Sequence, residues 1–408
     1  MAANHALLVE DFKRAQADVL AARRAGVVRE NALVAQMREA IQAGDMRPTD
    51  FDFGKLFIAC YGYHDFLQCK EGKQSAQEVF QRVSESDAGV TTAAFQNISG
   101  QIIYSGMTQE YKSEDFVFAK LIPEDKALIL DGEKMAGITE MGDVGAIRKE
   151  GDPYQEAGVG EDWIFTPPVP DRGAIVSITW EAVFNDRTGR VMEKAGNTGY
   201  WLGYGEEVQA IDCMIDENSL AHRYNWRTFG PMATYQDNTG THTFDNLTAA
   251  NPLVDWTSIN AAEQTLNQVV NPYTGTPILV EPTHLVVTKQ LEQTARRIVN
   301  ATEINVVTPG FATSGAPTKT AQANPYRDKY EILTSRLLAQ RMAVKTSWFL
   351  VNPAEAFLRK VAEPLNAVRE PSNSKDDFER RIVGRFRANK RYAHVTREPR
   401  VAHKSTAA

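Results

Sequence analysis

The chain has 408 residues, of which 43% are apolar and 24% are charged. At about 100–200 residues per domain, this length is typical of two or three folded domains, and the composition excludes a peptide and a wholly disordered chain. The net charge of −7 excludes a general basic field that would attract nucleic acid or anionic lipid to the whole surface.

The sequence contains no segment that predicts membrane insertion or secretion. No run approaches the roughly 18 uninterrupted apolar residues of a spanning helix. Charged residues at positions 10, 11, 13 and 14 interrupt the stretch that a secretory signal would keep apolar. Cys60, Cys69 and Cys213 are too few and too scattered for a disulfide framework or a zinc site. We therefore expect a protein of the reducing cytoplasm.

Residues 1–75 are predicted to form a largely helical N-terminal arm. Apolar residues recur at three- and four-residue steps at Leu8, Phe12, Ala15 and Val19, and the pattern restarts after residue 26. An amphipathic stripe of this kind needs a partner surface, which is either the body of the same chain or another subunit.

Residues 132–171 are predicted to form an extended β-hairpin loop. The segment is rich in glycine and proline, and Thr139–Asp171 holds eight acidic and two basic residues. A loop longer than about 12–15 residues is commonly functional, and alternation in Ala136–Ile147 and around Trp163–Phe165 favours two strands. Because a lone hairpin is marginally stable, we expect this one to lie on another surface.

The rest of the chain mixes predicted strands and helices, so the expected fold class is α+β. A long helix is expected over Arg187–Asn218, with a kink or break in its first half, because each glycine from Gly189 to Gly205 disfavours a helix by roughly 1 kcal/mol. Thr288 is expected to cap a helix over Lys289–Asn300. The remaining expected elements are strands at Ala174–Trp180, Thr283–Val287, Tyr330–Leu338 and Thr346–Val351, a helix at Ser258–Val270, a loop at Thr308–Pro325, a helix starting at Asn352-Pro353, and alternating stretches at Arg381–Ala388 and Tyr392–Val395.

Motifs of the common enzyme classes are missing from the sequence. There is no glycine-rich phosphate loop with its lysine, no nucleophile elbow and no HExxH motif, and the seven histidines are scattered. The nearest nucleophile and base set is Cys213 with Asp216 and His222. Cys213, however, falls on the apolar side of the long predicted helix, where a thiol is usually inert. We predict no catalytic site, no cofactor and no metal site.

Several stretches of the sequence follow one another in an order that is typical of one family. They are Thr91–Tyr104 followed by Phe118–Pro123, the 132–171 loop leading into Gly173–Asp186, then Pro282–Arg296, and finally Ser347–Pro353 with Asp377–Arg387. In this order and spacing, over about residues 80–400, the chain resembles the major capsid proteins of tailed phages with the Hong Kong 97-type fold, and among them the Mu-like group.

The resemblance implies a division of the chain and a function. It places an N-terminal arm at 1–75, a peripheral domain with a long spine helix at 76–131, 172–222 and 346–408, the extended loop at 132–171, and an axial domain at 223–345. The implied function is a major capsid protein that assembles in the host cytoplasm into pentamers and hexamers, which form an icosahedral virion shell around packaged double-stranded DNA.

The resemblance also implies partners. The chain would bind copies of itself together with portal, scaffolding and decoration proteins. It would meet packaged DNA by non-specific proximity only, and it would have no membrane partner.

The uneven distribution of charge suggests how one copy would meet the next. Lys375–Ala408 holds ten basic and four acidic residues, so we expect the acidic extended loop to lie on a basic strip of a neighbouring subunit. Because an exposed ion pair contributes under about 1 kcal/mol, the effect would come from the number of pairs. The contact candidates are Glu150, Asp152, Glu156, Glu161 and Asp162 on the loop, and Arg380, Arg381, Arg385 and Arg387 on the strip.

Other functions fit parts of the pattern. A bacterial nanocompartment shell shares the fold and would be encoded beside a cargo enzyme instead of terminase and portal genes. Another phage structural protein, such as a tail or decoration protein, would form tubes or trimers. An enzyme of unrecognised type would lose activity on Cys213→Ala or His222→Ala. The tail arginines could also follow a phosphate backbone, although stacking aromatic residues are scarce there.

Overall fold

The structure of the chain is a computed structural model, and it combines helices and strands throughout, which confirms the predicted α+β class. It describes residues 63–71, 73–74, 104, 106–136, 163–179, 190–217, 224–226, 230–237, 244–270, 277, 281–308, 318–369 and 382–407.

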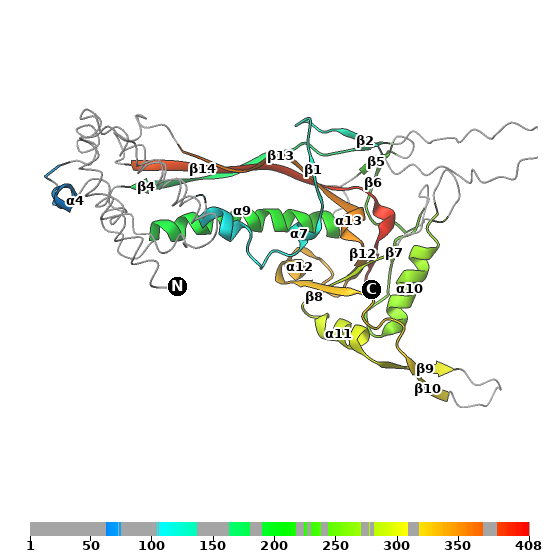
Figure 1. Ribbon diagram of the computed structural model, residues 1–408. Helices are drawn as coiled ribbons and strands as arrows, with labels where there is room; N and C mark the ends of the chain where they lie inside the picture. Colours follow the sequence, from blue (N-terminus) through cyan, green and yellow to red (C-terminus); the bar gives the residue numbers. More distant parts are fainter. Residues whose placement is uncertain are drawn as a thin grey trace, which may run out of the picture. The chain divides into compact units, whose positions relative to one another are not determined.

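The helices and strands of the described residues are labelled in Figure 1. The helices are α4 (Tyr63–Lys70), α7 (Phe118–Leu121), α9 (Arg190–Ile215), α10 (Trp256–Asn267), α11 (Glu292–Asn300), α12 (Arg336–Arg341), α13 (Pro353–Ala356) and the 3-10 turn η2 (Pro399–Val401). The strands are β1 (Glu124–Lys126), β2 (Lys134–Ala136), β3 (Trp163–Phe165), β4 (Asp171–Thr179), β5 (Tyr224–Trp226), β6 (Gly230–Met232), β7 (Leu247–Thr248), β8 (His284–Thr288), β9 (Glu303–Thr308), β10 (Thr318–Ala323), β11 (Glu331–Ser335), β12 (Trp348–Val351), β13 (Phe357–Arg369), β14 (Ile382–Thr396) and β15 (Ala402–Ser405). In the described part of the chain, no helix is both long and apolar enough to cross a membrane.

The chain divides into two compact units, each made of segments that are distant in sequence. The first unit is Met1–Glu114, Arg172–Tyr204 and Pro364–Lys390, and the second is Asp115–Asp171, Gly205–Glu363 and Arg391–Ala408. Helix α9 and strands β13 and β14 each contribute residues to both units. The domain boundaries expected from the resemblance stay predictions.

A five-stranded sheet in the second unit has the order β11-β8-β12-β15-β7 and is covered by helices on both faces. Along β12, side chains alternate between the faces. Trp348 and Leu350 pack in a cluster with α10 and α11. Phe349 and Val351 pack in another cluster with α12 and the second half of α9. A strand that is buried on both faces is apolar throughout, which accounts for the continuous Trp-Phe-Leu-Val run.

Local expectations beside this sheet need correction. Thr288 does not cap α11, because it ends β8 and its hydroxyl donates to the carbonyl of Lys345 at 2.8 Å. The predicted strand over Tyr330–Leu338 stops at Ser335, whose Oγ accepts a hydrogen bond from the amide of Leu337 and starts α12. Part of the predicted loop at 308–325 is strand β10, which pairs with β9 over six residues.

A second sheet has the order β1-β13-β14-β4. Strand β14 joins the two alternating stretches predicted at Arg381–Ala388 and Tyr392–Val395 into one strand of 15 residues. Strand β13, with 13 residues, was not predicted, because Pro364 and the adjacent basic pair Arg359-Lys360 interrupt its apolar pattern. This strand places Lys360 at the site described below.

Helix α9 runs without a break from Arg190 to Ile215, so the predicted break in its glycine-rich half is wrong. The glycines lie where another segment of the first unit comes close. A Cβ added to Gly199 would lie 2.1 Å from the carbonyl oxygen of Met107, and one added to Gly196 would lie 3.2 Å from Cγ of Glu110. The close packing at these glycines, against backbone at Gly199 and against a side chain at Gly196, offsets their intrinsic cost in a helix.

Gly199→Ala is therefore expected to destabilise the protein by about 1–3 kcal/mol, because the new Cβ would overlap the Met107 backbone even though alanine favours a helix. Gly205→Ala is the matched control on the same helix, since its Cβ would meet only the Tyr392 hydroxyl at 4.0 Å. That control should be neutral or stabilising by up to about 1 kcal/mol. Denaturant unfolding measures both, and equal stabilities would contradict the role given to Gly199.

Candidate functional site

Strands β2 and β3 form the start of a projecting hairpin. They pair antiparallel with Lys134 opposite Phe165, Met135 opposite Ile164 and Ala136 opposite Trp163. The pairing agrees with the expected extended loop, whose middle, residues 137–162, lies outside the described residues. We call residues 124–136 and 163–170, together with Lys360, the hairpin root; all belong to the second unit.

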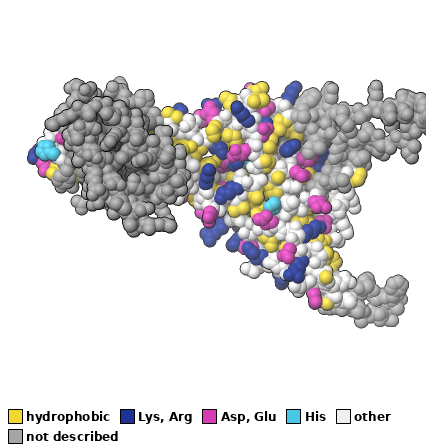
Figure 2. Space-filling model, viewed as in Figure 1, with side chains coloured by type: hydrophobic (Ala, Val, Ile, Leu, Met, Phe, Trp, Pro, Cys, Tyr) yellow, Lys and Arg dark blue, Asp and Glu magenta, His cyan; other side chains and the backbone are white. Residues whose placement is uncertain are grey.

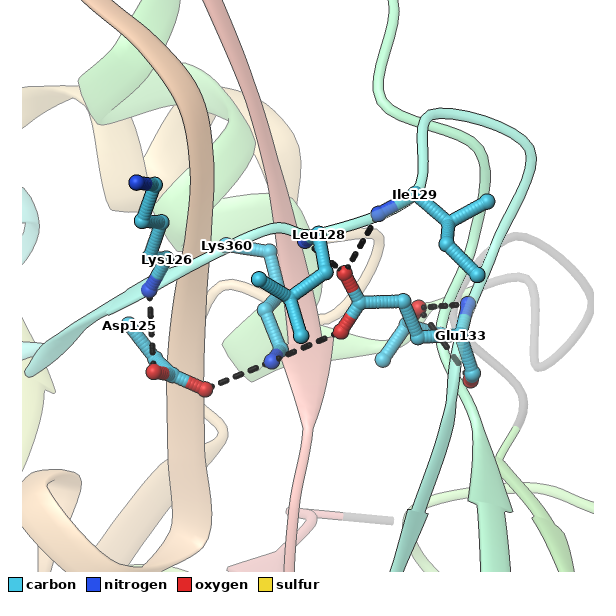
Figure 3. Close-up of polar contacts among 7 residues, drawn as sticks. Asp125, Lys126, Leu128, Ile129, Glu133 and Lys360 are labelled. Carbon is cyan, nitrogen blue, oxygen red and sulfur yellow. Dashed lines mark hydrogen bonds and ion pairs between the residues drawn. The ribbon is translucent and has the colours of Figure 1, made fainter.

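A buried lysine lies at the centre of the hairpin root. Lys360 stands opposite Asp125 in the parallel pairing of β13 with β1, and its side chain is only 5% exposed. Its Nζ donates to Oδ2 of Asp125 at 2.5 Å and to Oε2 of Glu133 at 3.1 Å (Figure 3). Because a buried charge must be paired, the two carboxylates stabilise this ammonium. We call the three residues the Lys360 clamp.

The carboxylate of Glu133 also organises the turn between β1 and β2. Its Oε1 accepts hydrogen bonds from the amides of Leu128 and Ile129, the latter at 2.8 Å, as Figure 3 shows. The amide of Glu133 donates to Thr166 Oγ1 at 2.8 Å, and the amide of Thr166 donates to the carbonyl of Glu133 at 2.9 Å. Each of these amide and carbonyl groups therefore has a hydrogen-bond partner within the hairpin root.

A glycine allows the turn to close against β3. Gly132 has a φ of +94°, which side chains rarely adopt, and a Cβ there would lie 2.7 Å from the carbonyl oxygen of Thr166. Next to it, the amide of Val169 donates to the carbonyl of Leu130 at 2.8 Å. The turn is thus held on both sides of its tip.

The clamp is charged at neutral pH. The Lys360 ammonium lowers the pKa of Asp125. Burial works to raise the pKa of Glu133, but the amides of Ile129 and Leu128 and the ammonium of Lys360 outweigh it and lower that pKa. Burial works to lower the pKa of Lys360, but the two carboxylates raise it. The ammonium therefore stabilises both carboxylates, and each carboxylate stabilises the ammonium.

The turn presents consecutive apolar side chains to solvent. Leu128 is 83% exposed, Ile129 57% and Leu130 46%. The flanking Ala127 and Val169 are buried and pack together in a small core with Ala393. The apolar residues are exposed while their neighbours are anchored, so this turn is an ordered apolar surface.

The adjacent residue of β13 ties the same region to helices. Arg359 Nη1 donates to Oε1 of Glu206 at 2.5 Å and to the carbonyl of Ala119 at 2.9 Å, and its Nη2 pairs with Glu124. Both Arg359 and Lys360 pair with β1, but since successive residues of a strand point to opposite faces, Arg359 also reaches α7 and α9 whereas Lys360 reaches Glu133.

Beside Arg359, the fully buried Glu207 accepts hydrogen bonds from the amides of Val117, Phe118 and Ala119 at 2.8–3.1 Å. Its pKa is raised because burial outweighs the three amides and the nearby Lys120. These amides begin helix α7, so the carboxylate holds the start of that helix against α9.

The predicted contact residues are only partly described. Arg385 is half-buried and Arg387 is exposed on β14. The others lie outside the described residues, and the predicted contacts stay predictions; they are Glu150, Asp152, Glu156, Glu161, Asp162, Arg380 and Arg381.

Two further basic residues of β14 bind within the chain. Lys390 donates to the hydroxyl of Tyr111 at 2.6 Å, and Arg391 lies 3.6 Å from Asp171 and 3.5 Å from Glu363. They are therefore not arranged as a free strip along which a phosphate backbone could run.

The nearest nucleophile and base set has no catalytic geometry among the described residues. Cys213 is fully buried, and burial raises its pKa to about 12. Its Sγ has Thr396 Oγ1 as a partner at 3.8 Å, and Asp216 accepts the amide of Thr234 instead of contacting the thiol. His222 lies outside the described residues. The thiol is core filling, as predicted from its position on the helix.

The sequence patterns predict neither the clamp nor the exposed turn. Ala127–Leu130 is an apolar run that ends at Asp131-Gly132, which is typical of a buried strand followed by a turn. A buried lysine requires a partner, but the interrupted pattern of β13 does not show that Lys360 is buried. The identity of that partner is a property of the fold alone.

Comparison with known proteins identifies the family. The family described as phage capsid protein matches residues 166–405, which is more than half of the chain. The chain belongs to this phage capsid protein family. The match confirms the resemblance to phage capsid proteins, and it supports the predicted function of a major capsid protein that forms an icosahedral shell; the Mu-like subgroup stays a prediction. Curated proteins give no sequence match.

Solved structures similar to this capsid protein have low sequence identity. A virus-like particle from Pyrococcus furiosus is 9% identical, with a TM-score of 0.38 over 74% of this chain and 96% of that chain. The capsid of an empty GTA particle is 12% identical, with a TM-score of 0.44 and coverages of 72% and 91%. The mature capsid of bacteriophage PhiM1 is 14% identical, with a TM-score of 0.43 and coverages of 72% and 87%.

Removing the lysine of the clamp is expected to destabilise the capsid protein. Lys360→Met leaves Glu133, whose side chain is 11% exposed, without its counter-charge. The free energy of unfolding is expected to fall by about 2–4 kcal/mol. This is at the low end for a broken buried pair, because the side chain of Asp125 is half exposed. Lys126→Met, an exposed lysine one residue from Asp125, is the control and should change stability by less than about 0.5 kcal/mol. Urea unfolding at neutral pH measures the stability of both variants, and equal stabilities would contradict the clamp.

The contribution of the clamp should also disappear in acid. Asp125 and Glu133 have lowered pKa values in the folded protein, so their stabilisation is present above the unfolded values of about 4 and is lost as the pH falls through the folded values. Lys360 has a raised pKa, so its stabilisation is lost only as the pH rises beyond about 10. The stability difference between native protein and Lys360→Met should be constant from about pH 6 to 9 and shrink below about pH 4. An undiminished difference at about pH 3 would contradict this assignment.

Proposed function

We propose that this capsid protein is the major subunit of a tailed-phage head of the Hong Kong 97 type. Copies assemble into hexamers and pentamers that close an icosahedral shell around packaged double-stranded DNA. Assembly takes place in the host cytoplasm, with portal, scaffolding and decoration proteins as further partners. The subunit acts as a structural component and has no catalytic activity.

The observation that carries the proposal is the family match over residues 166–405. This range contains α9, the five-stranded sheet and the long strands β13 and β14, so it spans most of the described core. The match favours a phage head over a nanocompartment shell or a tail protein, because the family is described as phage capsid protein.

The chemistry of the described residues is in keeping with a structural role. Among them, no group of three or more histidine, cysteine, aspartate or glutamate side chains could hold a metal ion. On the face seen in Figure 2, basic and acidic side chains are interspersed over the described part of the chain. The described part of this face has no large basic field for sequence-independent DNA binding, in keeping with the proposed contact with DNA by proximity only.

The experiment that tests the proposal is electron microscopy of the purified chain, expressed alone and together with the genes beside it, combined with its mass from light scattering. Closed shells, or rings of five and six subunits, are expected. Tubes or trimers would instead identify another phage structural protein, and a chain that remains monomeric under both conditions would overturn the proposal.

Charge reversal tests the proposed contact between the extended loop and a neighbouring subunit. Replacing Glu150, Asp152, Glu156, Glu161 and Asp162 by lysine should prevent or weaken assembly, because five weak pairs would become repulsive together. Replacing Arg380, Arg381, Arg385 and Arg387 by glutamate in the same chain should restore part of it. Sedimentation velocity at low and high salt measures the effect, which salt should reduce. Unaltered assembly of the five-lysine variant would count against this contact.

A further inference from the structure

The exposed turn of the hairpin root is unusual for a surface that stays in water. Leu128, Ile129 and Leu130 are consecutive, and each has between 46% and 83% of its surface exposed. Single exposed apolar residues are common, but consecutive ones are avoided unless they serve a contact. We call these three residues the apolar tip.

Three backbone groups of the apolar tip already have hydrogen-bond partners within the subunit. The amides of Leu128 and Ile129 donate to the carboxylate of Glu133, and the carbonyl of Leu130 accepts from the amide of Val169. A turn that remains in solvent does not need such partners, because water provides them. A turn that becomes buried does need them, since a buried polar group without a partner is costly. The apolar tip can therefore lose its water without leaving these groups unpaired.

The Lys360 clamp fixes the conformation in which the apolar tip is presented. Lys360 binds one carboxylate oxygen of Glu133 while the two amides bind the other, and Asp125 binds Lys360 (Figure 3). A surface that is ordered before binding loses less conformational entropy when its partner arrives. The clamp thus prepares the apolar tip for a contact.

From these observations we propose that the apolar tip is a contact surface for a second copy of this chain. The inference rests on the proposed function, which requires each subunit to bind copies of itself. A capsid subunit meets other subunits and DNA, and an apolar surface without a cation does not suit a phosphate backbone. Protein–protein interfaces, by contrast, have apolar cores that are depleted in charge.

The position of the apolar tip favours a second copy as its partner. Residues 137–162 leave from β2 and return at β3, and the chain just after β3 is hydrogen-bonded to the turn that carries the apolar tip, through Thr166 to Glu133 and through Val169 to Leu130. This segment has 26 residues. At about 3.3 Å per extended residue, half of it could reach about 40 Å, which is far enough to lie on a neighbouring subunit. The apolar tip would continue that proposed contact back to the hairpin root.

The test is a pair of substitutions that keep the turn and remove its apolar character. Leu128→Ser with Ile129→Ser leaves the backbone amides and the clamp in place and affects only exposed side chains. We expect assembly of this variant to require a protein concentration at least about tenfold higher, because two apolar side chains no longer leave water on contact. Val254→Ser, which is 60% exposed elsewhere in the second unit, is the matched control and should assemble like the native chain.

Sedimentation velocity over a concentration series, with particle images, measures assembly, and thermal unfolding of the monomer measures folding. An unchanged melting temperature with weakened assembly supports the inference. Assembly of the double variant at the native concentration overturns it and leaves the proposed function standing. A native chain that forms no oligomer, alone or with the products of neighbouring genes, overturns both. Assembly of the native chain only with another virion protein, which then protects the apolar tip, would replace the second copy by that protein as the partner.

Discussion

A buried ammonium needs counter-charges, and this requirement at Lys360 determines the geometry of the hairpin root. The partners come from β1 and from the turn before β2, so that one charge joins β13 to a residue 227 positions away in the sequence. Once Lys360 holds one carboxylate oxygen of Glu133, the other oxygen is directed at the amides of Leu128 and Ile129. The conformation of the turn, the exposure of its apolar side chains and the start of the hairpin all follow from this arrangement. Because broken buried pairs are costly, the alternatives to it are few.

The same principle operates on the other face of β13. Arg359 connects the strand to Glu206 on α9 and to the carbonyl of Ala119, while Glu207 accepts three amides at the start of α7. Arg359 and two adjacent acidic residues therefore join β13, α7 and the second half of α9 within the second unit. Apolar packing alone is non-directional, whereas each of these buried groups accepts only partners at hydrogen-bond distance. They specify which elements meet, and the apolar clusters around the five-stranded sheet provide most of the stabilisation.

Sequence patterns predicted the elements whose stability is local. Helix α10 and strand β12 were predicted from periodicity and from a short apolar run, because both signals depend on residues within the element. The continuity of α9 was not predicted, since the reason for its glycines is the backbone of Met107, about 90 residues earlier in the chain. The exposure of Leu128 was not predicted either, because it depends on a carboxylate held by a lysine from another strand. The charged contacts that the sequence suggested concern two subunits, and one chain does not contain their partners.

The two kinds of contact proposed for this capsid protein differ in range, and so they would act at different stages of assembly. Charges on the extended loop act across about 8 Å at physiological ionic strength and would orient approaching subunits. The apolar tip acts only at contact, and because its side chains carry no charge, ionic screening does not weaken it. A closed shell repeats the same contact many times, so each contact must have one geometry while remaining weak enough for a wrongly placed subunit to leave. The Lys360 clamp meets the first condition because it orders the apolar tip before binding, and the small size of that tip meets the second.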